Sequence, residues 1–171
     1  MMLAFREALT ALLPAPEETL HRHLQQMEAR DWAPLAELFA AHLPEFDAVL
    51  ALPGAETLGE QVAQMRGVPL LRAGAGALSG PAGAGGQGER EALLLTPQLG
   101  TGDAELAALQ QARDQRLNIT VLGSAVERTS LGGRQRLTQL GVTVRAALQL
   151  ADTPEGLNLE RRAPDRWLTS A

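Results

Sequence analysis

The chain has 171 residues and a formal net charge of −5, and it contains no cysteine. This length suits one domain with its own hydrophobic core, and the missing cysteines exclude disulfides, thiol nucleophiles and cysteine metal sites. Lysine is absent as well, which excludes Schiff-base chemistry through a lysine and a P-loop lysine. The arginines are scattered and aromatic residues are few, so nucleic acid is not expected as a partner.

Residues 1–45 are predicted to be helical. Apolar residues recur at helical spacing over residues 3–13. A second helix is predicted to begin near Pro16, with Glu17 and Glu18 in its first turn, where carboxylates interact favourably with the helix dipole. Asp31 is predicted to cap a third helix. The first quarter of the chain therefore forms an N-terminal helical segment.

From residue 46 onward, short apolar runs alternate with helical patterns. Strand–helix alternation at this spacing predicts right-handed crossovers and a mainly parallel sheet with helices on both faces. The predicted fold class is therefore α/β, with a five-stranded sheet. The strands are predicted at residues 47–52, 68–72, 92–95, 118–122 and 142–148, and the intervening helices at 58–67, 103–113 and 131–140.

Two segments are predicted to lie outside the regular elements. Residues 73–88 consist almost entirely of Gly, Ala, Ser and Pro, so burial gains too little to offset the ordering entropy and a flexible loop is expected. Such a loop is either an active-site lid or an ordinary disordered insertion. Residues 151–171 are predicted to be a solvated tail, in which Arg161, Arg162 and Arg166 accompany Trp167.

Neither a signal peptide nor a membrane span is predicted. Arg6 and Glu7 interrupt the apolar pattern at the start of the chain, and no stretch reaches the roughly 20 apolar residues of a spanning helix. A cytoplasmic protein without a membrane partner is therefore expected. His21 and His23 are two residues apart and point to different faces of a helix, so no metal site is expected.

Four segments of the core follow one another in a recognisable pattern. They are FDAVLALPGAETLG at 46–59, RGVPLLR at 66–72, LLLTPQLGTGD at 93–103 and VERTSLGGRQRLTQLGVTVRAALQL at 126–150. Together they resemble the phosphoribosyltransferase family, and in particular its orotate branch. The resemblance implies a three-layer α/β domain with residues 46–150 as its core and residues 73–88 as the family's flexible hood loop.

The resemblance also implies two turns that hold anions. They are a pyrophosphate loop at Pro53, Gly54, Ala55 and Glu56, and a phosphate turn at Gly100, Thr101, Gly102 and Asp103. In the family the second turn receives the ribose 5-phosphate at a helix N-terminus, which suits an anion. The alternative is a tight strand-to-helix turn with Asp103 as its N-cap. The carboxylates of Glu56 and Asp103 would oppose a bound anion.

The chain departs from the family's pattern at the signature strand. Two adjacent acidic residues of the family, which hold the ribose hydroxyls, are replaced by Thr96 and Pro97. Each charge-assisted hydrogen bond contributes roughly 1.5–3 kcal/mol, so the double loss predicts sugar binding that is weaker by orders of magnitude. The loop at 73–88 also has no basic side chain to neutralise a leaving pyrophosphate. Ordinary phosphoribosyl transfer is therefore not expected.

The sequence predicts a phosphoribosyltransferase-like protein that acts as a binding or regulatory module for a nucleotide or another phosphorylated small molecule. One alternative is an active orotate-type phosphoribosyltransferase with an altered site, and only this alternative would require Mg²⁺. Another alternative is a structural interaction protein that dimerises. The resemblance implies a homodimer in any of these cases, and no catalytic residue is assigned.

Overall fold

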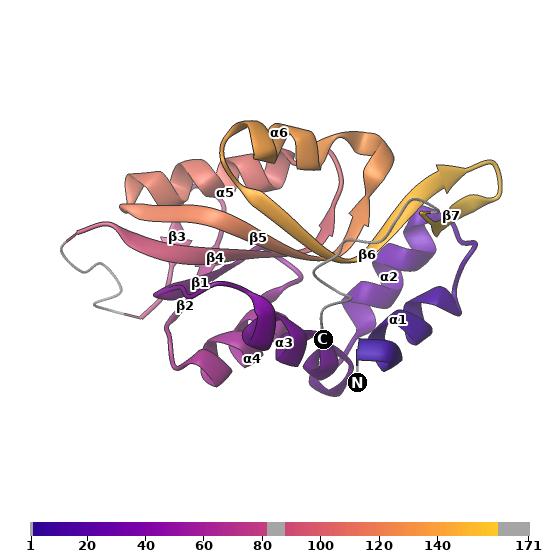
Figure 1. Cartoon of the computed structure of the whole chain (residues 1–171), viewed down its shortest axis with the longest axis horizontal. Helices are drawn as coiled ribbons and strands as arrows, with labels where there is room; N and C mark the ends of the chain where they lie inside the picture. Colours follow the sequence, from indigo (N-terminus) through magenta and orange to yellow (C-terminus); the bar gives the residue numbers. More distant parts are fainter. Residues whose placement is uncertain (1, 82–87, 161–171) are drawn as a thin grey trace.

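The computed structural model describes residues 2–81 and 88–160. Six α-helices and a seven-stranded sheet form three layers in this part of the chain (Figure 1). The helices are α1 (Met2–Thr10), α2 (Glu17–Gln26), α3 (Ala29–His42), α4 (Glu56–Arg66), α5 (Asp103–Asp114) and α6 (Gly133–Gln139). The strands are β1 (Ala48–Ala51), β2 (Leu70–Ala73), β3 (Leu78–Ser79), β4 (Arg90–Leu99), β5 (Leu117–Arg128), β6 (Thr143–Thr153) and β7 (Gly156–Leu159).

The strands lie in the order β3-β2-β1-β4-β5-β6-β7. The five inner strands pair in parallel, and β3 and β7 are antiparallel additions at the two edges. In the centre, Leu50 pairs with Leu71 of β2 and with Leu94 of β4. The carboxyl ends of the parallel strands therefore meet at one edge of the sheet, and the turns after β1 and β4 lie beside each other.

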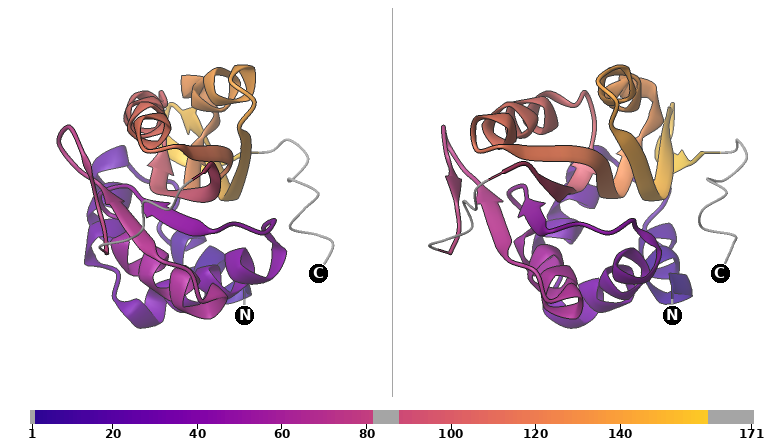
Figure 2. Two further views of the ribbon diagram at one scale, coloured as in Figure 1. Left: turned by 90° about the vertical axis from the view of Figure 1, so that its left-hand side faces the viewer. Right: turned by 60° about the vertical axis from the view of Figure 1, so that its left-hand side comes forward.

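Helices cover both faces of the sheet (Figure 2). On one face α1 to α4 pack against Val49 and Ala51 of β1, and on the other face α5 and α6 pack against Ala48 and Leu50. This alternation follows from the period of two in a strand, because successive side chains point to opposite faces. All four residues of β1 are buried between these two layers. The buried residues of α1, α2 and α3 belong to the same apolar cluster as the sheet, so the helices of residues 1–45 share one core with it.

The mainly parallel α/β sheet is confirmed, but it has seven strands rather than five. Strand β3 lies inside the segment 73–88 that was predicted to be a flexible loop, and β7 lies inside the predicted tail 151–171. Both are short antiparallel additions to the preceding strand, and two or four residues are too few for a periodic signal. Residues 82–87 of the loop and 161–171 of the tail, with their arginines and Trp167, lie outside the described residues.

Strand β4 is longer than predicted and contains both Thr96 and Pro97. Proline lacks an N–H and is tolerated only where a strand has an open side. Such a side exists here, because the neighbouring strand β1 ends at Ala51. The last backbone hydrogen bond between the two segments runs from the N–H of Leu52 to the carbonyl oxygen of Leu95, before Pro97 is reached. The signature strand thus continues past the end of its neighbour.

The predicted starts of two helices have different outcomes. Helix α2 begins at Glu17, with Glu17 and Glu18 in its first turn, as predicted. Helix α3 begins at Ala29, so the prediction that Asp31 caps it is wrong. Glu28 is the cap residue, and Asp31 accepts a hydrogen bond from its backbone N–H at 2.8 Å in a capping box. No described helix is both long enough and apolar enough to cross a membrane.

Gly133→Ala is expected to destabilise the fold, because a Cβ at this position would collide with the carbonyl oxygen of Gly100 and lie 3.0 Å from Leu99 Cδ1. We expect urea denaturation to show a loss of about 1–3 kcal/mol in the free energy of unfolding, as overpacking causes elsewhere. Gly74→Ala is the matched control, since its nearest neighbour would be 3.4 Å away. Equal losses in the two variants would contradict this account of the packing.

Candidate functional site

The candidate site is a pocket of about 520 Å³ at the carboxyl ends of β1 and β4. The chain order of the sheet reverses between these strands, since β1 leads to β2 on one side and β4 leads to β5 on the other. Ligands of open α/β sheets bind at such a switch point. The pocket is lined by Pro53 after β1, by Thr96 and Pro97 of β4, by residues 100–105 and by helix α2.

The predicted phosphate turn leads from β4 into α5. Gly102 is the N-cap residue and adopts a left-handed φ of +89°, so the prediction that Asp103 is the N-cap is wrong. Asp103 is instead the first helical residue, and its carboxylate accepts a hydrogen bond from the hydroxyl of Thr101 at 2.9 Å. Arg136 of α6 donates to Asp103 at 2.7 Å and to the carbonyl oxygen of Thr101 at 2.8 Å.

These contacts change the electrostatics of the turn. The hydrogen bonds from Arg136 and Thr101 hold the pKa of Asp103 below its usual value, so its carboxylate is charged at neutral pH. The hydroxyl that would serve a bound phosphate is thus occupied by a carboxylate of the chain itself. The start of α6 holds the turn in place, because the N–H of Gly133 donates to the carbonyl oxygen of Gly100 at 3.1 Å.

In the predicted pyrophosphate loop, too, a carboxylate of the chain itself occupies a hydrogen-bond donor. Gly54 adopts a φ of +91°, and its N–H donates to the carboxylate of Glu56 at 2.7 Å. Ala55 is buried and is the N-cap residue of α4, which begins at Glu56. Pro53 lines the pocket, whereas the other three loop residues are not part of its lining. The backbone N–H of Gly54, which could otherwise donate to a bound anion, is therefore occupied by Glu56.

Thr96 and Pro97, where the resemblance predicts the family's acidic pair, contribute to the packing of the site. Thr96 is buried, and its hydroxyl donates to Glu105 of α5 at 2.8 Å. The ring of Pro97 packs against Gly54, where an added Cβ would lie 3.1 Å from Pro97 Cγ. Neither residue offers a charged hydrogen-bond acceptor.

Glu105 is a site residue that the sequence analysis missed. It is 4% exposed and lines the pocket. Burial raises its pKa, and the hydrogen bond from Thr96 opposes that effect. Its position in the first turn of α5 is equally typical of an exposed helix start. Nothing local in the sequence therefore distinguishes Glu105 from an exposed acid.

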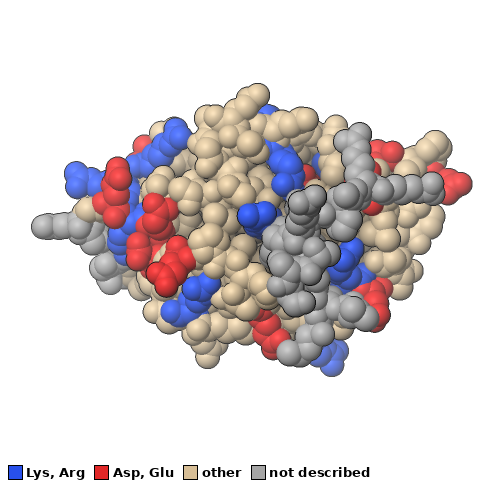
Figure 3. Space-filling model, in the orientation of Figure 1, with Lys and Arg blue, Asp and Glu red and all other residues tan. Residues whose placement is uncertain are grey.

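The lining of the pocket offers little positive charge. Among the described residues, no arginine lines the pocket, whereas Glu17 and His21 of α2 do. Arg128 of β5 pairs with Glu17 at 2.6 Å and with Asp152 at 2.7 Å, so its charge is already compensated. On the face drawn in Figure 3, arginines and acidic side chains are interspersed, without a continuous basic surface.

The residues of the pocket do not fit a bound Mg²⁺ ion. Its three carboxyl groups are already engaged: Glu17 with Arg128, Asp103 with Arg136 and Glu105 with Thr96. Across residues 2–81 and 88–160, no three His, Cys, Asp or Glu side chains are grouped so that they could hold a metal ion. Magnesium chemistry would therefore need ligands from elsewhere, such as a substrate.

No protein-family model and no curated protein matches this sequence. Solved structures do match. Orotate phosphoribosyltransferase from Mycobacterium tuberculosis H37Rv, in complex with inorganic phosphate, aligns with a TM-score of 0.62 at 16% identity over 71% of this chain and 73% of its own. The orotate phosphoribosyltransferase from Aeropyrum pernix aligns with a TM-score of 0.61 at 14% identity over 71% and 72% of the two chains.

A larger protein contains the same fold. UMP synthase from Leishmania donovani aligns with a TM-score of 0.59 at 20% identity over 70% of this chain, which matches only 27% of the UMP synthase chain. Identities this low establish similarity of fold rather than of activity. The arrangement of strands, helices and turns described above, together with these likenesses, leads to one conclusion: the chain has the three-layer α/β fold of the phosphoribosyltransferases, as its sequence predicted.

Proposed function

We propose that this protein does not perform ordinary phosphoribosyl transfer and acts instead as a binding or regulatory module for a nucleotide or another phosphorylated small molecule. The observation that carries the proposal is the use made of the acidic-pair positions. Thr96 donates its hydroxyl to the buried Glu105, and Pro97 packs against Gly54. Both positions contribute to the packing of the site and neither can hold a ribose hydroxyl as a carboxylate would.

Two further features oppose the transfer reaction. A leaving pyrophosphate gains stability from cations and from backbone donors aimed at its developing charge. In the described part of the chain no arginine lines the pocket, and the N–H of Gly54 donates to Glu56 instead of to a ligand. Phosphoribosyl pyrophosphate would therefore be bound weakly here, and cleavage of the bond to its pyrophosphate group would be slow.

The phosphate turn supports binding of a phosphate. It retains a left-handed glycine and the N-terminus of α5, whose dipole favours an anion. The side chain of Asp103 is 74% exposed, so it can rotate away from the turn. A phosphate in place of this carboxylate would accept a hydrogen bond from the hydroxyl of Thr101 and would lie within reach of Arg136. Asp103 is thus a built-in competitor for the ligand's phosphate.

The two alternatives have less support. An active phosphoribosyltransferase would need another group to bind the ribose hydroxyls, and Glu105 is not free to do so, because it is buried and accepts from Thr96. A dimerising interaction protein would need a continuous apolar surface. Among the described residues the large exposed apolar side chains are Met65 and Leu140. Met65 lies in α4 and Leu140 follows α6, and these two helices cover opposite faces of the sheet (Figure 2).

Asp103→Asn is expected to strengthen the binding of nucleoside monophosphates. Two unit charges about 4 Å apart in water interact by about 1 kcal/mol, so removing the repulsion should lower Kd about five-fold. Isothermal titration calorimetry of the unaltered chain and the variant, with phosphoribosyl pyrophosphate as a further ligand, provides the measurement.

Asp114→Asn is the matched control, because it removes the same charge from the exposed end of the same helix. It should leave Kd unchanged. An absence of heat with every ligand, in both the unaltered chain and Asp103→Asn, would reject the binding module. Equal effects of the two substitutions would reject the role of Asp103 as a competitor.

Glu105→Gln is expected to remove a pH dependence of stability. Because burial raises the pKa of Glu105 in the folded state, the unfolded chain releases this proton at a lower pH. The native fold therefore loses stability as the pH rises from the ordinary glutamate value through the folded-state value. Urea denaturation across this range should show the loss in the unaltered chain and a smaller loss in Glu105→Gln. Parallel pH profiles would contradict the burial of an ionisable carboxyl at this position.

A further inference from the structure

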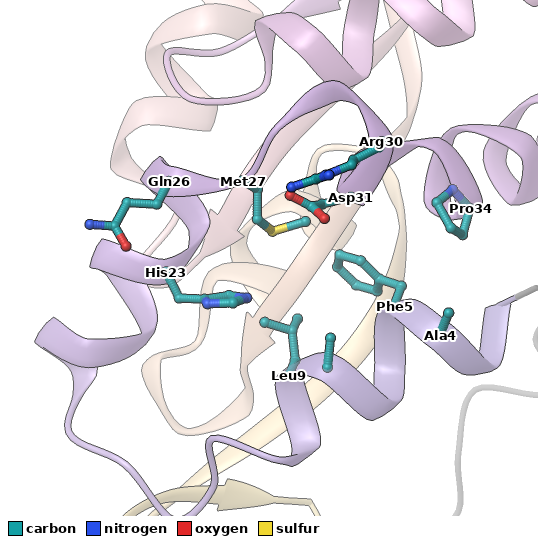
Figure 4. Close-up of a pocket in the computed structure, with 10 residues that line it drawn as sticks. Ala4, Phe5, Leu9, His23, Gln26, Met27, Arg30, Asp31 and Pro34 are labelled. Carbon is teal, nitrogen blue, oxygen red and sulfur yellow. The ribbon is translucent and has the colours of Figure 1, made fainter.

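A second pocket lies between the first three helices, away from the carboxyl edge of the sheet. It has a volume of about 370 Å³. Phe5 and Leu9 of α1 and Met27 after α2 face one another across it, with His23 and Asp31 at its rim (Figure 4). An apolar floor with a few polar groups at the rim is typical of a site for a ring-bearing group. Neither the candidate functional site nor the proposed function uses this pocket.

The sequence contains one segment whose composition matches such a pocket. Residues 161–171 read RRAPDRWLTSA, in which Trp167 and Leu168 are the only large apolar residues. A tryptophan side chain buries roughly 150–250 Å² when it is enclosed, which makes it an effective anchor. The only other tryptophan of the chain, Trp32, is in the core at 2% exposure. Trp167 is therefore the one tryptophan that lies outside residues 2–81 and 88–160.

The chain leaves the described fold near the helices that form the pocket. Ala15, between α1 and α2, pairs with Leu157 of β7 through two backbone hydrogen bonds of 3.1 and 2.7 Å. From there the ten residues of α2 extend about 15 Å toward Met27. The seven residues from Glu160 to Trp167 span up to about 24 Å when extended. The extended segment is therefore longer than helix α2, which separates the Ala15–Leu157 pair from Met27.

The charges of the two partners are opposite. Residues 161–171 contain three arginines and one aspartate, a formal charge of +2, while the whole chain carries −5, so residues 1–160 carry −7. The rim of the pocket is mixed in charge, because Arg30 lines it together with Asp31 and pairs with the exposed Glu28 at 3.2 Å. Attraction between exposed charges acts over a Debye length of about 8 Å at physiological salt. The net charges of the two parts, rather than the rim itself, favour the chain's own segment over an acidic peptide as the occupant.

We propose that Trp167 of the chain's own C-terminal segment docks in the pocket between α1, α2 and α3. The segment thereby closes the apolar gap between Phe5, Leu9 and Met27 within the same molecule. This inference is independent of the ligand and the activity of the site at the carboxyl edge of the sheet.

The fluorescence of the full chain tests this proposal. The emission of Trp167 is the difference between the spectra of the unaltered chain and Trp167→Phe. If Trp167 is docked, its emission should be blue-shifted and several-fold less quenched by acrylamide than in the urea-unfolded chain. Ala8→Arg, at an exposed position of α1 that lines the pocket, should shift the emission to the red and restore quenching. Ala107→Arg, at an exposed position of α5 on the opposite face, should change neither.

Three outcomes would overturn the proposal. Trp167 in the unaltered chain could be quenched as freely as in urea, or its protection could survive Ala8→Arg, which would place it elsewhere. Protection that is lost on dilution would place the segment in a second copy of the chain. Circular dichroism checks that Ala8→Arg is folded, and Ala4→Arg, at another exposed position of the pocket lining, replaces it if it is not.

Discussion

The parallel pairing of β1 with both β2 and β4 is the constraint on which the rest of the structure depends. It sets the point where the chain order of the sheet reverses, and it brings the turn at Pro53 beside the turn at residues 100–103. The ring of Pro97 can reach Gly54 only because these strands are neighbours. The continuation of β4 beyond the end of β1 gives that proline its open side. The pocket is thus a consequence of the topology.

Carboxylates of the chain itself occupy donors at which phosphoribosyltransferases are expected to hold anions. Glu56 accepts from the amide of Gly54, and Asp103 accepts from Thr101 and Arg136. Each carboxylate satisfies a donor that would otherwise face solvent or a ligand. The geometry of both turns is therefore stable without a bound anion. This property underlies our proposal that a phosphate competes with Asp103 at the second turn.

The fold could largely be predicted from the sequence because its signals are periodic. Alternating strands and helices indicated the parallel sheet, and glycine at position 102 indicated the turn before α5. The edge strands β3 and β7 could not be predicted, since their pairing depends on the neighbouring strand rather than on their own few residues. Asp31 was predicted to be the N-cap because an acidic residue is favourable both at the N-cap and, in a capping box, three residues after it.

The candidate site could be predicted only in part, for a similar reason. The resemblance predicted turns at residues 53–56 and 100–103, and the structure has a helix start at each. That these turns hold anions, and that Thr96 and Pro97 replace an acidic pair, stay predictions. The partners of these residues did not follow, because Glu105 and Arg136 reach them through tertiary packing. A buried acid and an exposed acid in the first turn of a helix have the same local sequence pattern. Only the packing of α5 against β4 separates them.

The central claim is that this site does not transfer phosphoribosyl groups, and the release of pyrophosphate tests it most directly. The full chain is incubated with phosphoribosyl pyrophosphate, Mg²⁺ and a panel of bases that begins with orotate, and free pyrophosphate is measured over time. Our account expects no release above that of the buffer with any base. Base-dependent release that is abolished by Thr101→Ala would contradict it, because the turn at Thr101 would then support catalysis despite the replaced acidic pair.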